Sequence, residues 1–274
     1  MRVDAWLHTN EKHLASVGIS TAHLDCLVLL EDATGKDRSW LLAHPDHPLD
    51  SKVLGQLDTQ ISQRRLHVPL AYIRGKAEFY GREFTVNAHT LVPRPETETI
   101  ISLLKGLVRV ELSLARATFA DVGTGSGAIA ITAKLEFPEA TVFATDIDTE
   151  CLATADANAK KHKASIVCRY GNLLEALPLS TPPEILLCNL PYVPDNFQIN
   201  TAATHEPRHA LFGGPGGLDL YRELFGQTEK MGRPPKYLLT ESLPPQHKVL
   251  TGIAKDAGYH LRQTDDFIQL FELS

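Results

Sequence analysis

Apolar side chains recur at helical spacing throughout the first 75 residues. Ser20 or Thr21 can cap a helix that ends at Gly35. The inner side of this helix is expected to carry Leu24, Leu27, Val28 and Leu30. Ser51 can open a further helix, whose apolar positions are Val53, Leu54, Leu57 and Ile61. These patterns predict a small helical bundle over residues 1–75.

The pattern changes to short β-rich pieces in the segment AEFYGREFTV, which covers residues 77–86. The two pieces flank Gly81, and a glycine between two β-rich runs is typical of a hairpin. We therefore predict a β-hairpin linker over residues 76–90, with a domain boundary at this point.

Residues 91–274 alternate strand-like and helix-like patterns. Such alternation is typical of a doubly wound, mostly parallel sheet with helices on both faces. The candidate strands cover residues 117–123, 140–147, 164–170, 184–190 and 236–242. The last two strand-like segments, YHLRQTDD and FIQLFELS, are nearly contiguous, so we expect them to close the sheet as a hairpin with an antiparallel strand.

Composition and charge narrow the range of partners. The chain has 274 residues, enough for one large and one small domain, and 43% of them are hydrophobic. Its formal net charge of −6 predicts no broad basic surface, so we expect no direct nucleic-acid binding. No apolar run approaches the roughly 20 residues of a membrane span, and the first residues are too polar for a signal peptide. A cytosolic monomer without membrane contact is expected.

Cysteine and histidine spacing adds no metal or redox motif. The four cysteines are far apart and form no Cys-x-x-Cys pair, so they are expected to be reduced thiols, at Cys26, Cys151, Cys168 and Cys188. The histidines form no cluster with metal-ligand spacing, and no metal site is expected.

A glycine-rich segment, DVGTGSGA, follows the strand predicted at 117–123. Glycines there let the backbone approach a ligand, and the next helix presents free N–H groups. Asp146, at the tip of the next strand, can accept both hydroxyls of a ribose. These features fit NAD and S-adenosylmethionine alike. Asp121, ahead of the glycines, favours S-adenosylmethionine, because a carboxylate suits an ammonium group and disfavours a pyrophosphate.

The segment CNLPYVP ends the strand predicted at 184–190 with an amide, two prolines and a tyrosine. In an open α/β sheet this strand end faces the same crevice as the glycine loop. The prolines remove N–H donors, so the loop offers mainly acceptors. The side-chain oxygen of Asn189 and the carbonyl of Leu190 can accept both protons of an NH₂ group, with Tyr192 packed over its plane. The pattern therefore predicts a site for a planar amino or amide nitrogen, although Asn189 could instead only cap the next segment.

Several segments together resemble the HemK/PrmC protein-(glutamine-N5) methyltransferases, which act on class-one peptide chain release factors. They are PLAYIRGKAEFYGREFTV, LVPRPETE, DVGTGSGAIAI, NLPYV and EPRHALFGGPGGLDLYR, and they cover nearly the whole chain. The resemblance implies a Rossmann-like class I S-adenosylmethionine-dependent methyltransferase domain with a mostly parallel seven-stranded sheet and a C-terminal antiparallel hairpin. It also implies that the helical bundle helps to dock the protein substrate.

The resemblance further implies roles for individual residues. Those implied to bind the cofactor are Asp121, Gly123, Thr124, Gly125, Gly127, Asp146, Ile147, Asn172, Leu173 and Asn189. The glutamine of a Gly-Gly-Gln segment is implied to bind at Asn189, Leu190, Pro191 and Tyr192, which form the catalytic loop. Glu206 and Arg208 are implied to bind the substrate and to order this loop. Arg94 and Glu96 are expected to form a loop ion pair near the cofactor entrance.

The chain departs from the family pattern in three places. Leu190 stands where the Asn-Pro-Pro-Tyr motif has its first proline, so the loop gains freedom and an N–H group. The segment TESLPPQ replaces the usual glycine-rich EIGxxQ, although Glu241 and Gln246 are retained. Asn172 stands where an acidic residue is commoner, so adenine recognition is expected to rest on an amide or on main-chain groups.

The implied reaction is direct methyl transfer to the side-chain nitrogen of glutamine, without a dedicated general base. Two alternatives remain open at this stage. One is an amino-methyltransferase for adenine in DNA or RNA, because the same loop can hold an exocyclic NH₂ group. The other is a catalytically idle protein that binds the cofactor, an idea prompted by Leu190 and the TESLPPQ segment.

Overall fold

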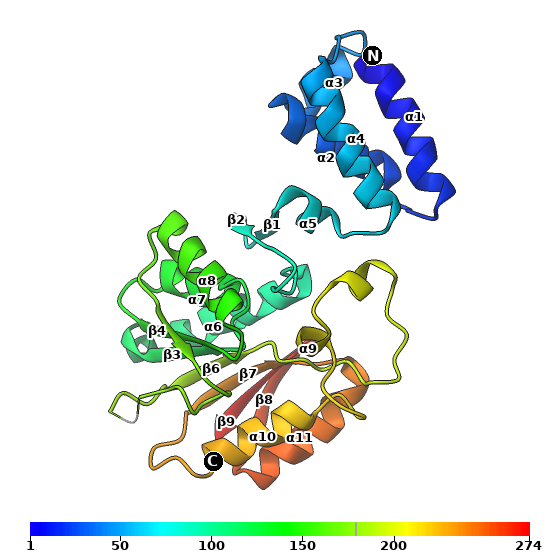
Figure 1. Cartoon of the computed structure of the whole chain (residues 1–274). Coiled ribbons are helices and arrows are strands. Elements are labelled where there is room, and N and C mark those ends of the chain that lie inside the picture. Colours follow the sequence, from blue (N-terminus) through cyan, green and yellow to red (C-terminus); the bar gives the residue numbers. More distant parts are fainter. Residues whose placement is uncertain (179) are drawn as a thin grey trace. The chain divides into compact units, whose positions relative to one another are not determined.

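The computed structural model describes residues 1–178 and 180–274, which divide into two compact units (Figure 1). The first unit combines Met1–Gly75 with the short segment Ile199–His205, and the second combines Lys76–Gln198 with Glu206–Ser274. The division after Gly75 lies at the point where the apolar pattern of the sequence changes from helical to β-rich.

The first unit is a helical bundle. Its helices are α1 (Val3–Ser16), α2 (Ala22–Thr34), α3 (Arg38–Ala43), α4 (Ser51–Arg65) and α5 (Leu70–Arg74), and it also contains η3 (Ala202–His205). Asp37 and Asp50 cap α3 and α4, since each accepts a hydrogen bond from a backbone N–H of the first turn at 2.8 Å. Ser51 is therefore the first residue of its helix, and Asp50 is the cap.

Helix α2 ends as predicted at Gly35, which adopts a left-handed conformation with φ of 67°. Its buried face was only partly predicted, because Leu24 is 45% exposed whereas Cys26, Leu29 and Leu30 are buried in the core of the bundle. Leu24 precedes Cys26 by two positions, which is about 200° around a helix, so it faces away from the core.

The second unit begins with a hairpin of β1 (Lys76–Phe79) and β2 (Arg82–Thr85). Phe79 and Phe84 of this hairpin are fully buried in the main core of the second unit. The hairpin is therefore packed into the second unit.

Within the described residues, the main sheet has seven strands in the order β5-β4-β3-β6-β7-β9-β8. They are β3 (Thr118–Val122), β4 (Thr141–Asp146), β5 (Val167–Tyr170), β6 (Ile185–Cys188), β7 (Tyr237–Glu241), β8 (Tyr259–Asp265) and β9 (Ile268–Leu273). Strand β9 is antiparallel to both of its neighbours, and the other pairings are parallel. Both the parallel sheet and its C-terminal antiparallel hairpin are confirmed.

The central strands are buried on both faces, which explains their nearly continuous apolar sequences. Successive side chains of a strand point to opposite faces, so Leu187 joins one core cluster while Leu186 and Cys188 join the other. Helices α6 (Glu98–Val110), α7 (Ala128–Glu136) and α8 (Thr149–His162) cover one face, and α10 (Asp219–Thr228) and α11 (His247–Asp256) cover the other (Figure 1).

The remaining elements are short. They are η1 (Pro95–Thr97), η2 (Leu112–Arg116), α9 (Arg208–Leu211) and η4 (Pro244–Gln246). Two of them matter for the site, because η1 carries Thr97 and α9 lies beside the catalytic loop.

The strand register brings the predicted site residues to one edge of the sheet. Val122, the last residue of β3, pairs with Thr145 on one side and with Cys188 on the other. The glycine loop, Asp146 and Asn189 each follow one of these three residues. The carboxyl ends of β3, β4 and β6 therefore present them side by side.

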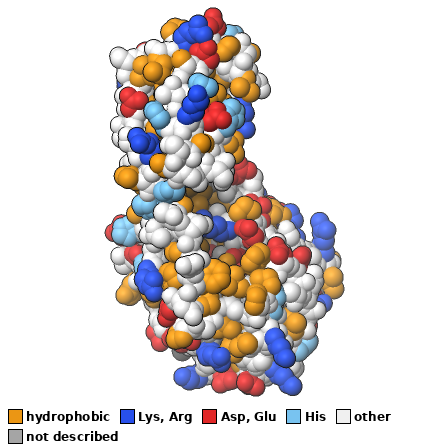
Figure 2. All heavy atoms as spheres, turned by 90° about the vertical axis from the view of Figure 1, so that its right-hand side faces the viewer, with side chains coloured by type: hydrophobic (Ala, Val, Ile, Leu, Met, Phe, Trp, Pro, Cys, Tyr) orange, Lys and Arg blue, Asp and Glu red, His pale blue; other side chains and the backbone are white. Residues whose placement is uncertain are grey.

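Two surface properties bear on partners. No helix among the described residues is long and apolar enough to cross a membrane. On the face shown in Figure 2, the described Lys and Arg side chains are interspersed with Asp and Glu, and no extended basic area is visible.

Candidate active site

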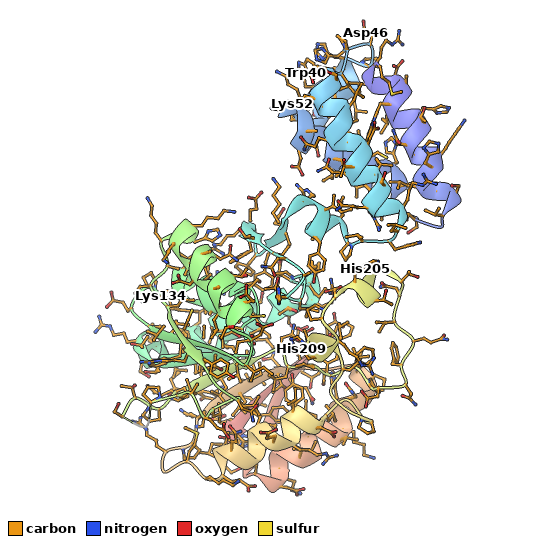
Figure 3. All side chains as sticks on the ribbon, in the orientation of Figure 1. Trp40, Asp46, Lys52, Lys134, His205 and His209 are labelled. Carbon is orange, nitrogen blue, oxygen red and sulfur yellow. The ribbon has the colours of Figure 1, made fainter. Side chains whose placement is uncertain are left out.

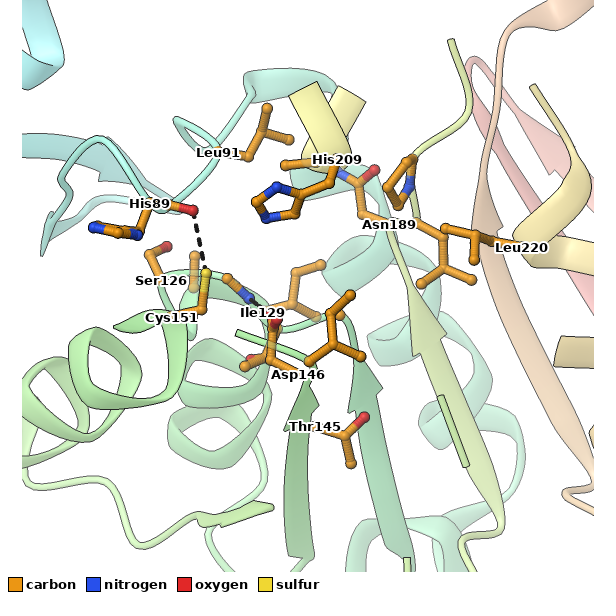
Figure 4. Close-up of a pocket in the computed structure, with 18 of the residues that line it drawn as sticks. His89, Leu91, Ser126, Ile129, Thr145, Asp146, Cys151, Asn189, His209 and Leu220 are labelled. Atoms are coloured by element: carbon orange, nitrogen blue, oxygen red, sulfur yellow. Dashed lines mark hydrogen bonds between the residues drawn. The ribbon is translucent and has the colours of Figure 1, made fainter. Parts of the chain in front are cut away.

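A pocket opens at the carboxyl edge of the main sheet (Figure 4). Most of the residues implied by the family resemblance line it: Gly123, Thr124, Gly125, Asp146, Ile147, Asn172, Leu173, Asn189, Leu190 and Pro191. Tyr192 and Arg94 line a smaller adjacent pocket, which shares the first three residues of the catalytic loop. The catalytic loop therefore borders both pockets.

The glycine loop needs glycine for its conformation and for its packing. Gly123, Gly125 and Gly127 have φ values of 73°, 54° and 81°, in the left-handed region. A Cβ on Gly127 would lie 3.0 Å from the Cβ of Ala155 in α8, so this glycine allows close packing of the loop against that helix. Gly127 does not line either described pocket, and its role is to shape the loop.

Asp121 lies beneath the glycine loop and is fully buried. Its Oδ2 accepts hydrogen bonds from the hydroxyl of Thr124 at 2.6 Å and from the N–H of Ala130 at 3.0 Å, while Oδ1 has no partner among the described residues. Burial raises its pKa to about 7. Asp121 therefore ties the loop to the first turn of α7, and it does not line the described pockets.

Asp146 holds the opposite side of the loop. Its Oδ2 accepts from the N–H of Gly125 and its Oδ1 from the N–H of Asp148, both at 2.9 Å. Burial raises the pKa of this carboxyl, and the two backbone hydrogen bonds oppose the rise. Each oxygen keeps a further lone pair, so the carboxylate can still accept hydrogen bonds from a ligand in the pocket. Ile147, the next residue, is 56% exposed and offers the ligand an apolar surface.

Asn172 lines the same pocket, and its side chain is hydrogen-bonded to Glu223 of α10. Its Nδ2 donates to Oε1 of Glu223, and Gln227 donates to the same oxygen at 3.3 Å. Since the amide nitrogen faces Glu223, the amide oxygen is left as the acceptor on the other side. At position 172, where the family more commonly has an acidic residue, the amide oxygen of Asn172 thus serves as the hydrogen-bond acceptor. The nearby carboxylate belongs to Glu223.

Asn189 follows β6 and points into the pocket, near His209 (Figure 4). His209 belongs to α9 and is labelled in Figure 3. Its Nδ2 donates to the hydroxyl of Thr97 at 2.9 Å. This bond orients the amide, because the oxygen Oδ1 then lies on the side away from Thr97.

Leu190 does not loosen the loop. Its additional N–H donates to the hydroxyl of Tyr221 at 3.3 Å, and its side chain is only 2% exposed. The side chain packs against the glycine loop, where a Cβ on Gly123 would lie 3.1 Å from Leu190 Cδ2. The expected gain in loop freedom is therefore wrong, because the N–H is satisfied and the side chain is in the core.

The hydroxyl and the backbone carbonyl of Tyr192 are both bound by the TESLPPQ segment, one of the departures from the family pattern. Its hydroxyl donates to Oε1 of Glu241 at 2.9 Å, and its carbonyl accepts from Nε2 of Gln246 at 2.7 Å. Gln246 in turn accepts from the N–H of Leu243 at 2.9 Å. The TESLPPQ segment thus keeps the two residues that contact the catalytic loop, and its prolines begin η4.

The glycine-rich segment after α9 packs on the catalytic loop. Val193, which follows Tyr192, accepts from the N–H of Gly213 at 3.0 Å and donates to the carbonyl of Leu211, the last residue of α9, at 2.9 Å. A Cβ on Gly213 would lie 2.2 Å from the carbonyl oxygen of Pro191, and one on Gly217 would lie 2.1 Å from that of Tyr192. These two glycines are therefore required for the close approach of the two backbones.

The expected ion pair between Arg94 and Glu96 is replaced by a longer-range one. Arg94 pairs with Glu206 at 2.5 Å, and the Glu206 side chain is only 3% exposed. Glu206 also accepts from the N–H of Val92 at 3.1 Å, so it joins the segment before η1 to the segment before α9. Arg208 is exposed, lies 3.8 Å from Asp195, and stacks over Phe212. Neither Glu206 nor Arg208 lines a described pocket.

Sequence reasoning missed several residues of the site. Thr97, His209 and Cys151 line the pocket, and the thiol of Cys151 donates to the carbonyl of His89, which also lines it (Figure 4). Thr97 and His209 lie in the LVPRPETE and EPRHAL segments, which pointed to the region but not to these side chains. The four cysteines are free thiols, three of them buried and Cys168 half-buried.

Solved structures share the fold of a large part of this chain. The hMettl16 catalytic domain, solved with a MAT2A 3'UTR hairpin, aligns with a TM-score of 0.55 at 14% identity over 78% of this chain and 81% of that one. A T. thermophilus 16S rRNA methyltransferase, RsmC, solved with AdoMet and guanosine, aligns with a TM-score of 0.51 at 15% identity over 73% and 49%. The fold and the site define a class I methyltransferase.

Two family models match the chain: the PrmC N-terminal domain over residues 5–75 and the methyltransferase small domain over residues 103–208. The Release factor glutamine methyltransferase of Koribacter versatilis is 36% identical over 84% of this chain and 82% of its own length. That of Bacillus subtilis is 40% identical over 72% and 69%. The chain belongs to the release factor glutamine methyltransferase family.

Proposed function

We propose that this protein transfers a methyl group from S-adenosylmethionine to the side-chain amide nitrogen of the glutamine in the Gly-Gly-Gln segment of a peptide chain release factor. The observation that carries the proposal is the position of Asn189, whose amide nitrogen is engaged by Thr97 and whose oxygen is left for an N–H donor in the pocket. We place this activity in the cytosol and assign the bundle of the first unit to docking of the release factor.

The residues of the larger pocket fit S-adenosylmethionine. Asp146 offers acceptors for the ribose hydroxyls, and the amide oxygen of Asn172 offers one for the exocyclic amine of adenine. Ile147 and Leu173 supply apolar surface for the adenine ring. Above about pH 7, where Asp121 is ionised, its carboxylate together with Asp146 suits a ligand that carries positive charge on sulfur and nitrogen.

Asn189 and Leu190 prepare the acceptor nitrogen. A glutamine nitrogen is a weak nucleophile, because its lone pair is delocalised into the carbonyl group. Oδ1 of Asn189 and the carbonyl of Leu190 accept its two N–H groups, which fixes the plane of the amide and raises electron density on nitrogen. Tyr192 covers that plane. Such positioning can contribute on the order of 7 kcal/mol to lowering a barrier.

S-adenosylmethionine supplies a methyl group on a sulfonium sulfur, and its transfer to the amide nitrogen leaves a neutral thioether and releases one proton to water. The protein needs no general base for this step, because nitrogen becomes acidic as its new bond to carbon forms. The task of the catalytic loop is therefore to hold and orient the amide.

The decisive experiment is mass spectrometry of a purified class-one release factor after incubation with this protein and isotope-labelled S-adenosylmethionine. We expect one labelled methyl group on the glutamine of Gly-Gly-Gln. Asn189→Ala should abolish the label even at a concentration of S-adenosylmethionine that saturates the variant. The matched control is Asn196→Ala, an exposed residue of the same loop, which should label normally.

Other outcomes point elsewhere. Cofactor binding without any label on the release factor would reject the proposed substrate. A label on adenine in nucleic acid would indicate the amino-methyltransferase alternative, and binding without transfer to any acceptor would indicate an idle cofactor-binding protein.

A further inference from the structure

We infer that one polar face of α8 positions a wall of the S-adenosylmethionine pocket and thereby sets the affinity for the cofactor. The wall is the part of the pocket lining formed by His89, Leu91 and Pro93. The polar face of α8 is formed by Cys151, Thr154 and Asn158. Thr154 and Asn158 line neither described pocket, so they act through the segment that they hold. The inference rests on the proposed function and deepens it.

The segment from residue 83 to residue 89 runs along α8 in the direction opposite to the helix. Four alternate residues of the segment contact four helix side chains that are three or four positions apart. The pairs are Glu83 with His162, Thr85 with Asn158, Asn87 with Thr154 and His89 with Cys151. Residues at this spacing share one face of a helix, and alternate residues of a strand such as β2 share one side. The two periods therefore match along the whole contact.

Asn158 lies in the middle of this contact and is completely buried. Its Oδ1 accepts from the N–H of Thr85 at 2.8 Å, and its Nδ2 donates to the carbonyl of the same residue at 2.9 Å. Nδ2 also donates to the carbonyl of Ser126 in the glycine loop at 2.9 Å. Because Nδ2 faces two carbonyl groups, the orientation of the amide is fixed. One side chain thus joins the end of β2 to the loop that binds the cofactor.

Thr154 holds the turn that leads into the wall. Its hydroxyl accepts from Nδ2 of Asn87 at 2.9 Å and donates to the carbonyl of Glu150 in its own helix at 2.9 Å. Oδ1 of Asn87 accepts from the N–H of His89, also at 2.9 Å. The amide of Asn87 is therefore bound at both ends, and it connects α8 to the first residue of the wall.

Cys151 extends the contact to the pocket itself. Its thiol donates to the carbonyl of His89 at 3.2 Å, as the dashed line in Figure 4 shows. Burial raises the pKa of this thiol, so it stays protonated and remains a donor. The polar face of α8 thus reaches from the end of β2 to the lining of the pocket.

Cofactor binding and the position of the wall should be coupled. Strand β2 ends at Thr85, so the segment beyond it depends on the turn and on the side chains of α8. A ligand that packs against a wall already in place does not bear the entropic cost of ordering it. By linkage, a bound cofactor should in turn stabilise the wall.

The chemical step should depend less on this face of α8. Glu206 holds the N–H of Val92 at 3.1 Å, just beyond the wall, and Thr97 orients Asn189 through its own hydrogen bond. Loss of a contact with α8 is therefore expected to change the affinity for the cofactor and to leave the rate at saturating cofactor nearly unchanged.

The test measures the Kd of S-adenosylmethionine by calorimetry and kcat for release-factor methylation at saturating cofactor. Hydrogen exchange of a peptide that covers residues 85–92 is followed by mass spectrometry, with and without the cofactor. The variants are Thr154→Val, Thr154→Ser and Asn158→Ala. The matched control is Thr132→Val in α7, which removes a fully buried hydroxyl without a partner among the described residues.

We expect Thr154→Val to raise the Kd about threefold to tenfold, because the turn before the wall loses a hydrogen bond. Asn158→Ala should raise it further, since its amide makes three hydrogen bonds. Thr154→Ser keeps the hydroxyl and should restore most of the affinity, and Thr132→Val should bind the cofactor as the wild type does. The kcat of Thr154→Val at saturating cofactor should stay close to that of the wild type.

Hydrogen exchange separates positioning of the wall from a general effect on stability. Without cofactor, residues 85–92 should exchange faster in Thr154→Val than in the wild type, and the cofactor should slow this exchange in both proteins. A purely structural role of Thr154 would speed exchange throughout the protein and leave the Kd unchanged.

The two levels of inference fail differently. If the wild type does not bind S-adenosylmethionine, the proposed function fails and the role of α8 fails with it. If the wild type binds the cofactor but Thr154→Val keeps the wild-type Kd, or Thr132→Val raises the Kd equally, the positioning role is overturned and the proposed function stands. Should Asn158→Ala fold poorly, Thr154→Val and Thr154→Ser still decide.

Discussion

The backbone N–H of Leu190 donates to the hydroxyl of Tyr221, which lies 3.3 Å away and is completely buried. The same hydroxyl donates to the carbonyl of Glu241 at 2.5 Å and approaches that of Cys188 at 3.2 Å. One tyrosine thus links the ends of β6 and β7, and it accepts the N–H that a proline at position 190 would not have.

We expect Tyr221→Phe to lower the free energy of unfolding by about 1–3 kcal/mol, because it leaves a buried N–H without a partner. In the Leu190→Pro background the same change should be less destabilising, since no N–H remains. Urea unfolding of the four proteins gives the coupling energy. Tyr259→Phe, which removes a buried hydroxyl bonded to the carbonyl of Pro235, is the control and should combine additively with Leu190→Pro.

A second prediction concerns adenine recognition by Asn172 and Glu223. Asn172→Asp alone should weaken S-adenosylmethionine binding about tenfold, because two carboxylates then face each other. Adding Glu223→Gln should recover most of the affinity, since the glutamine amide can donate to the introduced carboxylate. Calorimetric Kd values for the single and double variants test this, with Glu229→Gln, at the exposed residue directly after the same helix, as control. Equal effects of Asn172→Asp in both backgrounds would contradict it.

A third prediction follows from burial of Asp121. Its pKa is raised from 3.8 to about 7 in the folded state, so folding favours its protonated form. The resulting stabilisation is complete below about pH 4 and is lost as pH rises through about 7.

The free energy of unfolding of the wild type should therefore fall between pH 5 and pH 8 by about 2 kcal/mol more than that of Asp121→Asn. The variant gains this amount of stability relative to the wild type as the pH is raised. The amide oxygen still accepts from Thr124 and Ala130. Urea unfolding without cofactor at the two pH values measures the effect, and the exposed Asp156→Asn is the control. A parallel pH dependence of wild type and Asp121→Asn would show that Asp121 is ionised throughout.

A fourth prediction concerns the ion pair of Arg94 and Glu206. Arg94→Ala leaves a buried carboxylate without its charge partner and should destabilise the protein by about 3–5 kcal/mol. Glu206→Gln in the same background should recover part of this loss. Arg208→Ala is the control, because its exposed contact with Asp195 should contribute less than about 1 kcal/mol. Thermal or urea unfolding distinguishes them, and equal losses for Arg94→Ala and Arg208→Ala would count against the prediction.

Local patterns predicted much of the site. The glycines of DVGTGSGA predicted a loop whose backbone can approach a ligand closely, and Gly123 and Gly125 line the pocket. The alternating strands and helices predicted a parallel sheet, whose carboxyl edge must gather the loop residues that follow each strand. Asn189 and Asp146 could therefore be placed in one crevice without coordinates.

Hydrogen-bond and ion-pair partners that are far apart in the sequence could not be predicted in this way. Thr97 and Asn189 are separated by 92 positions, and Arg94 and Glu206 by 112. The sequence suggested Glu96 as the partner of Arg94 because it is near, whereas the fold brings a buried carboxylate closer. The prediction that Leu24 faces the core was wrong for a related reason. The helical period alone is compatible with more than one buried face, and packing against neighbouring helices decides which face is buried.

The amino-acid sequence by itself determined the two-part organisation, the order of strands and helices, and the identity of the residues at the strand ends. These depend on the period of apolar positions and on the backbone freedom of glycine and proline, which act over a few residues. Only the tertiary structure decided which way the Asn189 amide points, how Leu190 is accommodated, and what Glu241 holds. Those outcomes depend on which donors and acceptors meet when distant strands pair, because a buried polar group must find its partner among whatever groups the fold brings near.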